Sequence, residues 1–353
     1  MPRRRKRLDP ALFQIPVEQV RAGFYSDRYF VRTREVLLAD GRSPRVLMQV
    51  TCKRDAVLSG VDEAVAVLKL CADDWGALAV YALYEGDRID AWDTVLTIEG
   101  PYDGFAHLET LYLGALCCRT RVCTNTRAAV DAARPKPVLF FPARQDHWLM
   151  QPGDGWAAHV AGASAVSTDA QGSWWSARGI GTIPHALIAA YGGDTVRAAR
   201  AFAERVGPEA QVIVLVDYEN DSVRTSVEVA RALDGRLWGV RLDTSENVVD
   251  RSLLAQMGAF RPTGVNAPLV WNVRNALDAD GFGDVKIVVS GGFTAERIRR
   301  FEAEGVPVDA YGVGSALLEG RFDFTADIVM VDGAPQAKVG RGVRANSRLE
   351  RVR

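Results

Sequence analysis

The pattern of apolar and polar residues changes near residue 135, and each side of that point predicts a different kind of fold. Upstream, the pattern predicts strands over 43–51, Leu78–Tyr84 and Thr94–Glu99, and helices over 62–71 and 105–135. The segment 16–38 also favours a helix, but a cluster of aromatic residues interrupts it. Because strands and helices do not alternate regularly here, we expect an α+β domain.

Downstream of residue 135, short apolar runs alternate with amphipathic helical runs. The predicted strands are Val138–Phe141, His159–Gly162, Arg178–Gly181, Gln211–Val216, Leu237–Leu242, Lys286–Val289 and Val308–Tyr311. Helices are predicted over Asp194–Val206, Ser222–Leu233 and Ala267–Leu277. Repeated strand–helix units predict a parallel sheet with helices outside it. This number of strands, without a dinucleotide-binding fingerprint, favours a closed or nearly closed α/β barrel.

These patterns predict two domains joined by a short proline-rich linker at 133–138. We expect an N-terminal α+β domain over residues 1–134, completed by residues 321–353. The α/β barrel, which we expect to be the catalytic domain, covers 135–320. A chain of 353 residues is long enough for two such domains.

The segment 286–320 carries the strongest local signal for a binding site. Two predicted strands each run into glycines, first Ser290–Gly292 and then Gly312–Ser315. A helix lies between them, with Thr294 as its expected N-cap and Gly305 as its stop. In a βαβ unit these two turns share one edge of the sheet, where their backbone N–H groups favour a phosphate.

Other polar residues follow the predicted strands at that same edge. Arg241 and Asp243 alternate along a strand end, so both side chains are expected to point into the barrel mouth. Arginines pair with phosphate oxygens, and carboxylates hold Mg²⁺ or ribose hydroxyls. The mixture predicts a polyanionic substrate with a divalent cation. For any one of these carboxylates, a solvated or helix-capping role stays an open alternative.

His185 follows Pro184 in a helix that we expect to begin near Thr182. A helix N-terminus favours an anion beside it, so a phosphate on or near this imidazole would be stabilised there. A histidine that is simply hydrogen-bonded in a loop is the alternative reading. His107, His147 and His159 have no comparable setting.

Composition excludes several classes of protein. A formal net charge of −1 argues against a nucleic-acid partner held by bulk electrostatics. Five cysteines without a CxxC pair predict reduced thiols in a cytoplasmic protein, and neither disulfides nor a zinc site. No apolar run is long enough to span a membrane, so no membrane partner is expected. The basic ends, residues 2–7 and 338–353, are expected to be solvated.

Seven motifs together resemble the nicotinate phosphoribosyltransferase family, a group of type II phosphoribosyltransferases, over roughly residues 20–320. They are SDRYFVRT (26–33), HLETLYLGAL (107–116), GIGTIPHAL (179–187), VDYEND (216–221), GVRLDTSE (239–246), SGGFTAERI (290–298) and YGVGSALL (311–318). The resemblance implies transfer of a ribosyl 5-phosphate unit from phosphoribosyl pyrophosphate to the pyridine nitrogen of nicotinate. The products would be nicotinate mononucleotide and pyrophosphate, in the salvage route to NAD.

The resemblance also implies roles for individual residues. His185 would be phosphorylated from ATP, while Arg241 and Asp243 would hold the pyridine substrate and the ribose hydroxyls or Mg²⁺. The 5-phosphate would be bound by Gly291, Gly292, Gly312, Gly314 and Ser315. Further substrate contacts are expected from Arg144, Thr182 and Asp217.

The acceptor pocket implied by the resemblance involves residues from distant parts of the chain. Tyr29 would stack on the pyridine ring and Asp27 would shape the pocket, often from the neighbouring subunit of a homodimer with shared active sites. Ser164 would replace an aspartate of nicotinamide-specific relatives, so that a neutral residue favours nicotinate. Mg²⁺ is the expected cofactor and ATP the expected co-substrate.

Some features leave other functions open. After the strand at Val138 the family usually has two arginines, whereas this chain keeps Arg144 and has Gln145 next to it. The lost second arginine leaves open a non-catalytic paralogue that binds a phosphorylated ligand. A quinolinate phosphoribosyltransferase, which shares the fold and the donor, is the other alternative. The phosphohistidine motif argues against the quinolinate enzyme, which has no use for it. A Schiff-base aldolase is disfavoured because Lys286 begins a strand and does not end one.

Overall fold

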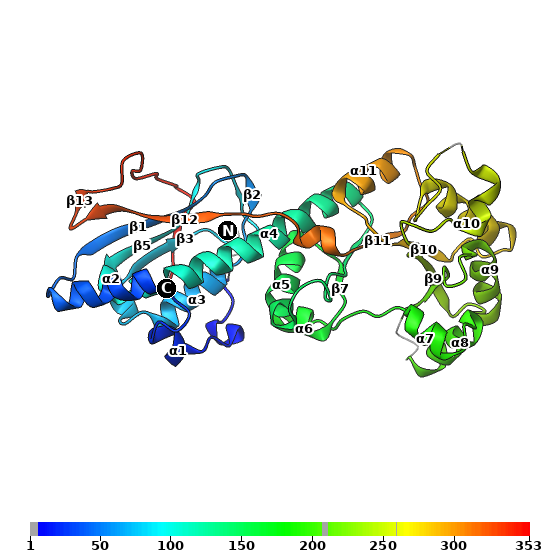
Figure 1. The fold of residues 1–353 in the computed structure, drawn as a ribbon, viewed down its shortest axis with the longest axis horizontal. Helices are drawn as coiled ribbons and strands as arrows, with labels where there is room; N and C mark the ends of the chain where they lie inside the picture. Colours follow the sequence, from blue (N-terminus) through cyan, green and yellow to red (C-terminus); the bar gives the residue numbers. More distant parts are fainter. Residues whose placement is uncertain (1–5, 207–210, 259) are drawn as a thin grey trace. The chain divides into compact units, whose positions relative to one another are not determined.

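The computed structural model describes residues 6–206, 211–258 and 260–353, so residues 2–5 of the predicted basic N-terminus lie outside the described part. The chain folds into two compact units (Figure 1). The first contains residues 1–124, 156–161 and 319–353, and the second contains residues 125–155 and 162–318.

The first unit is built on an antiparallel sheet with the strand order β13-β12-β1-β5-β3-β14. These strands are β1 (Arg45–Cys52), β3 (Ala79–Ala82), β5 (Thr94–Pro101), β12 (Phe324–Val331), β13 (Ala334–Pro335) and β14 (Glu350–Arg351), beside the small pair β2 (Ala56–Val57) and β4 (Arg88–Ile89). The helices are α1 (Val17–Arg21), α2 (Arg28–Ala39), α3 (Val61–Cys71) and α4 (Glu109–Ala133), the last of which continues into the second unit.

One apolar core holds this unit together. Side chains of α3, the first half of α4 and the central strands form a single buried cluster that includes Leu68, Tyr112 and Ile98. The cluster also takes in Phe324 of β12, although this residue is far from the others in sequence. Of the aromatic cluster predicted to interrupt 16–38, Phe24 and Tyr25 lie in a turn between α1 and α2, whereas Tyr29 and Phe30 belong to α2. Gly23 in this turn has a φ of 74°.

The second unit carries a six-stranded parallel sheet with the order β7-β6-β11-β10-β9-β8. The strands are β6 (Val138–Phe140), β7 (Ala165–Val166), β8 (Val212–Leu215), β9 (Leu237–Leu242), β10 (Lys286–Val289) and β11 (Ala310–Val313). The helices are α6 (Asp169–Gly172), α7 (His185–Ala190), α8 (Thr195–Arg205), α9 (Ser222–Leu233), α10 (Ala267–Ala279) and α11 (Ala295–Ala303). Helix α5 (Gln151–Ala161) begins in this unit, and its residues 156–161 belong to the first unit.

The sheet curves into a half-barrel. Leu139 of β6 and Ile213 of β8, from strands well apart in the sheet order, share one apolar cluster with Val288 of β10. Helices α8 to α11 follow the strands around the outside of the curve in Figure 1. The fold is therefore mixed α/β with a parallel half-barrel, which confirms the coarse class that the sequence predicts.

Two predicted strands of the barrel do not form. Residues 159–161 belong to the end of helix α5, and Gly162 follows it with a φ of 99°. Residues 178–181 have no regular secondary structure, although Ile180 N donates to Val166 O of β7. Three residues after Ile180, Ile183 N donates to Ile213 O of β8. Residues 180–183 therefore make one backbone hydrogen bond to β7 and one to β8, and they do not form the repeated pairs of a strand.

The basic C-terminal stretch is mostly exposed, as its composition predicts, but it is attached to the first unit. Its strand β14 pairs with β3, and Val352 N donates to Val80 O. Arg348 pairs with Asp93, and Arg341 pairs with Asp327. Carboxylates of the first unit therefore pair with two of the basic residues in this stretch. Near the other end of the chain, Arg7 pairs with the buried Asp62.

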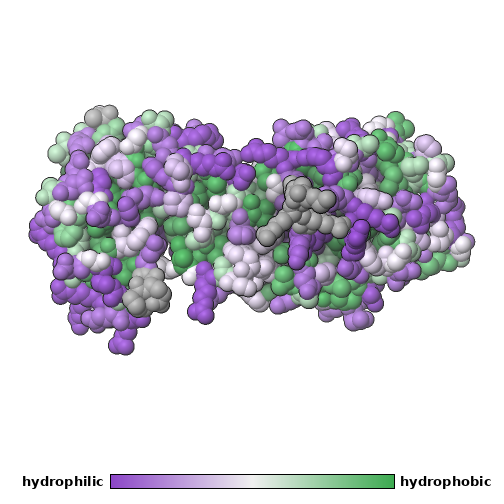
Figure 2. All heavy atoms as spheres, turned by 180° about the vertical axis from the view of Figure 1, so that it is seen from behind, coloured by the Kyte–Doolittle hydropathy of each residue, from purple (hydrophilic) through white to green (hydrophobic). Residues whose placement is uncertain are grey.

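Hydrophilic residues cover much of both units on the face drawn in Figure 2. Among the described residues, no helix is both long enough and apolar enough to cross a membrane.

Candidate functional site

Two glycine turns lie next to each other at one edge of the parallel sheet, as the sequence predicts. Strands β10 and β11 are hydrogen-bonded neighbours, and each is followed by one of the turns. Gly291 and Gly292 have φ angles of 82° and 68°, a region in which other residues are strained. This backbone conformation explains the pair of glycines after β10.

Gly312 has a different reason to be glycine. The structure extends β11 through Val313, so Gly312 lies inside the strand and not in the predicted turn. A Cβ atom at this position would lie 2.6 Å from the ring of Phe141. The turn after β11 therefore contains Gly314 and Ser315, and Gly312 allows the aromatic ring to approach the strand.

A cavity of about 560 Å³ opens beside these turns. Its size lies in the range typical of small-molecule sites. The predicted site residues that line it are Arg144, Thr182, His185, Arg241, Asp243, Gly291, Gly292, Gly312, Gly314 and Ser315. Segments spread over more than 170 positions of the second unit thus meet at the carboxyl-terminal edge of its sheet, where ligands of parallel α/β folds bind.

A hydrogen-bond network fixes Arg241 and Asp243 in this cavity. Arg241 Nε donates to Ser290 Oγ at 2.8 Å, and its Nη1 donates to Thr182 Oγ1 at 3.0 Å. Arg241 Nη2 lies 3.2 Å from Asp243 Oδ2, while Ser290 Oγ donates to Asp243 Oδ1 at 2.6 Å. The guanidinium also lies over the ring of Phe141. Both charged groups are therefore held in place before any ligand binds.

His185 lies at the cavity wall and contacts Asp217. Its Nε2 is 3.0 Å from Asp217 Oδ1, and that carboxylate is almost fully buried. The hydrogen bond raises the pKa of His185, while burial opposes the rise. Asp217 itself does not line the cavity and acts on it through the imidazole. The helix α7 begins at His185, with Pro184 as its N-cap, and not near Thr182. With only six residues, α7 gives little dipole support to an anion.

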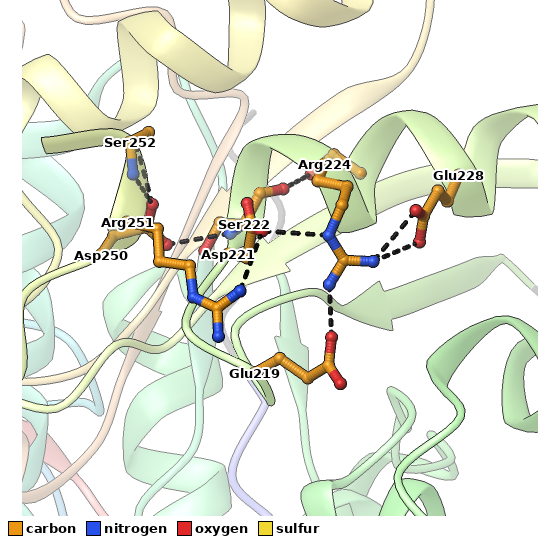
Figure 3. Close-up of polar contacts among 9 residues, drawn as sticks. Glu219, Asp221, Ser222, Arg224, Glu228, Asp250, Arg251 and Ser252 are labelled. Carbon is orange, nitrogen blue, oxygen red and sulfur yellow. Dashed lines mark hydrogen bonds and ion pairs between the residues drawn. The ribbon is translucent and has the colours of Figure 1, made fainter.

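The loop that presents Asp217 is fastened to its neighbour by the contacts in Figure 3. The buried Asp250 accepts hydrogen bonds from Ser222 N at 2.9 Å and from Ser252 N at 3.0 Å. Asp221 pairs with Arg224 at 2.9 Å. These contacts join the start of α9 to the segment after β9. They restrict the position of the carboxylate that orients His185.

Besides Asp217, three predicted residues are not among those that line this cavity. Ser164 precedes β7, and its N–H donates to Val138 O at the start of β6, so it lies at the opposite edge of the sheet. Asp27 and Tyr29 belong to the first unit, where Asp27 contacts Thr110 and Tyr29 is largely exposed.

Sequence reasoning missed two polar residues of the site. Ser290 was treated as part of a turn, yet its hydroxyl joins Arg241 to Asp243. Ser167 lines the cavity just after β7. A signal for Ser167 existed, because it follows the short apolar pair Ala165–Val166. The strand predicted at 159–162 is not formed, and the short strand β7 takes its place before Ser167.

Part of the chain matches a known family profile, and most of it matches curated proteins. Residues 27–119 match the family described as quinolinate phosphoribosyl transferase, N-terminal domain. A nicotinate phosphoribosyltransferase of Mycobacterium tuberculosis is 28% identical over 364 residues, which cover 92% of this chain and 76% of the relative. A nicotinate phosphoribosyltransferase of Bacillus subtilis is 25% identical over 241 residues, which cover 67% of this chain and 45% of the relative.

Solved structures share the fold. The crystal structure of nicotinate-nucleotide pyrophosphorylase from Pyrococcus furiosus matches with a TM-score of 0.81 and 34% identity, covering 94% of this chain and 81% of that one. The human nicotinic acid phosphoribosyltransferase matches with a TM-score of 0.66 and 18% identity, covering 88% and 76%. The second likeness shows the fold alone. The Pyrococcus furiosus protein is similar in both sequence and fold over most of both chains, which shows common descent.

Proposed function

The chain is related to nicotinate phosphoribosyltransferases and to a nicotinate-nucleotide pyrophosphorylase. We propose that it belongs to the nicotinate phosphoribosyltransferase family of type II phosphoribosyltransferases and makes nicotinate mononucleotide in NAD salvage. In this reaction phosphoribosyl pyrophosphate donates its ribosyl 5-phosphate unit to the ring nitrogen of nicotinate. The bond between the ribose carbon and pyrophosphate breaks, and its electrons leave with pyrophosphate. The nitrogen lone pair forms the new bond to that carbon.

One observation carries the proposal: the double turn and the Arg241–Asp243 network face the same cavity. The backbone N–H groups after β10 and β11 suit the 5-phosphate. Arg241 offers a positive charge to an acceptor carboxylate, and Asp243 suits the ribose hydroxyls. Because positive charge develops on the ribose carbon, positioning and electrostatics can supply most of the catalysis without a protein nucleophile.

The residues present fit a Mg²⁺ ion that is held largely by the substrate. Mg²⁺ commonly uses one or two protein carboxylates together with substrate phosphates and water. Asp243 supplies one carboxylate in the cavity, and no group of three metal-binding side chains occurs among the described residues. When bound, the ion would stabilise negative charge on the departing pyrophosphate. Asp243 is oriented for this role by Ser290 and Arg241.

We also propose that His185 couples ATP hydrolysis to the transfer through a phosphohistidine. Its imidazole lines the cavity, and the buried Asp217 orients the ring and favours its positive charge. An acid-labile phosphate should therefore be transferred from radiolabelled ATP to the wild type but not to His185→Ala. If ATP stimulates both proteins equally, the phosphohistidine proposal fails.

The acceptor end of the site rests on the family resemblance. We propose a homodimer in which Tyr29 and Asp27 serve the pyridine subsite of the neighbouring subunit. The exposed ring of Tyr29 supports this, because an exposed aromatic ring is available for stacking. Sedimentation analysis tests the dimer, and a monomer at assay concentrations would contradict it.

The decisive experiment offers three acceptors to the protein with phosphoribosyl pyrophosphate and Mg²⁺. We expect product from nicotinate, and little from nicotinamide or quinolinate, by chromatography of the mononucleotides. Arg241→Ala should lower kcat/KM by about 100-fold or more, because it removes a positioned charge from the reacting centre. The matched control is Arg231→Ala, since Arg231 lies on the surface and pairs only with Asp280. This control should stay within about twofold of wild type.

Other outcomes would select other functions. Preferential use of quinolinate with release of CO₂ would identify the decarboxylating enzyme. Absence of product from all three acceptors, with retained binding of the donor, would identify a non-catalytic relative.

A further inference from the structure

A second cavity, of about 600 Å³, lies in the second unit between the segment before α10 and the helix α11. It shares none of its lining residues with the candidate active site. Its volume again falls in the range of small-molecule sites. The family roles given above do not involve it.

Three arginines gather at this cavity: Arg261, Arg297 and Arg300. Arg261 and Arg300 are exposed and form no ion pair with another described residue. Arg297 is committed to backbone carbonyls, including Gly291 O at 2.9 Å. Burial lowers the pKa of Arg297, and the positive charges of Arg300 and Arg261 lower it further. The two carboxylates that line the cavity, Glu246 and Glu304, leave an excess of positive charge.

The rest of the wall is largely apolar. Phe260, Val265, Pro268 and Phe301 line the space between the arginines. Such walls favour a planar ring, whereas the unpaired guanidinium groups favour a phosphate. A ligand that joins both parts fits better than an inorganic anion, which would leave the apolar walls unused.

We propose that this cavity binds a phosphate monoester carried on a planar ring, as in a nucleotide. Arg261 and Arg300 pair with the phosphate, and the ring lies against the apolar wall. Neither side chain pairs with a carboxylate of the described residues, so binding does not require such an ion pair to be broken.

The cavity is connected to the first glycine turn through two side chains. Arg297 Nη1 donates to Gly291 O at 2.9 Å and to Gly292 O at 3.1 Å, while its Nη2 donates to Val265 O of the cavity wall. Glu246 lies against Gly292, because a Cβ atom there would be 2.6 Å from Glu246 Oε1. A phosphate beside Arg297 therefore alters the charge around the turn. The ligand thus regulates donor binding, an inference that rests on the proposed function of the turn.

Titration calorimetry with adenosine monophosphate tests the site without requiring activity. We expect one binding site in the wild type and affinity about tenfold weaker or lower in Arg300→Ala, which loses a charged hydrogen-bond donor. Arg299→Ala is the matched control, because Arg299 is exposed on the same helix and does not line the cavity. It should bind within about twofold of wild type. Adenosine, which lacks the phosphate, should not bind measurably.

Arg241→Ala separates the two cavities. If adenosine monophosphate occupied the candidate active site, this substitution would abolish binding, and the proposal would be overturned. No binding at millimolar concentrations, or equal weakening in Arg299→Ala and Arg300→Ala, would also overturn it. Regulation is tested separately by the dissociation constant of phosphoribosyl pyrophosphate with and without adenosine monophosphate. An unchanged constant in the wild type refutes the coupling, whether or not the protein is active with any acceptor.

Discussion

At the scale of single residues, His185 is the group whose charge we expect to respond to its partner most clearly. The hydrogen bond to Asp217 raises its pKa, and burial works in the opposite direction. Asp217→Asn removes the favourable charge and leaves the burial, so the pKa of His185 should fall. Proton NMR titration of the four histidines measures this, with His185→Gln to assign the signal. His107 provides an internal reference, because burial lowers its pKa to about 4.

The same pair sets a small pH dependence of stability. Because the folded pKa is raised, the stabilising contribution is complete below the unfolded value of about 6.5 and is lost as pH rises through the folded value. With 44% of the His185 side chain exposed, the contribution should stay below about 1 kcal/mol. In urea unfolding, the difference between wild type and Asp217→Asn should shrink from about pH 6 to about pH 9. A constant difference would show that the pair does not titrate with folding.

The residues of the candidate site differ in how far the sequence could predict their positions. Arg241 and Asp243 were predictable because alternate residues at a strand end point the same way, and both line the cavity. The part played by Ser290 could not be predicted. Its hydroxyl bonds to both charged residues only because β9 and β10 are neighbours, with Val289 opposite Leu242. Sequence alone does not fix that register.

At the scale of elements, the strands followed by glycines and the amphipathic helices were predicted well, whereas α5 was not. Its sequence contains Gly153 and Gly155, which disfavour a helix. The structure explains Gly155: a Cβ atom there would lie 2.1 Å from Gln171 O at the end of α6. Close packing of two segments therefore outweighs helix propensity. A contact between segments that are apart in the sequence cannot be predicted from helix propensity.

This packing predicts opposite effects on stability for two glycine-to-alanine substitutions, one in α5 and one in α4. Gly155→Ala should destabilise the protein by about 2 kcal/mol or more, because α5 and α6 must move apart. Gly114→Ala lies within α4, where a Cβ atom would meet nothing within 4 Å, and it should stabilise by up to about 1 kcal/mol. Thermal unfolding of both variants measures the difference. Equal effects of the two substitutions would mean that the contact with Gln171 is not restrictive.

At the scale of the whole molecule, the chain returns to its first unit after completing the half-barrel. Strand β12 pairs with β1 from Val46–Val331 to Cys52–Phe324, although the paired residues are more than 270 positions apart. Such pairing costs loop-closure entropy that local segments cannot offset alone. Residues 1–134 by themselves would lack this strand and the buried Phe324, so the first unit depends on the end of the chain.

Phe324→Ala tests this dependence without deleting any of the chain. The side chain is buried in the core of the first unit, and its truncation leaves a cavity that should cost about 3–5 kcal/mol. Val339→Ala is the control from the same C-terminal region: Val339 is 97% exposed, and its substitution should change stability by less than about 0.5 kcal/mol. Hydrogen exchange should show the loss of protection in β1, β5 and β12. If protection decreased only in β12 while β1 and β5 kept theirs, the first unit would be stable without its returning strand, and folding of the two chain ends would be independent.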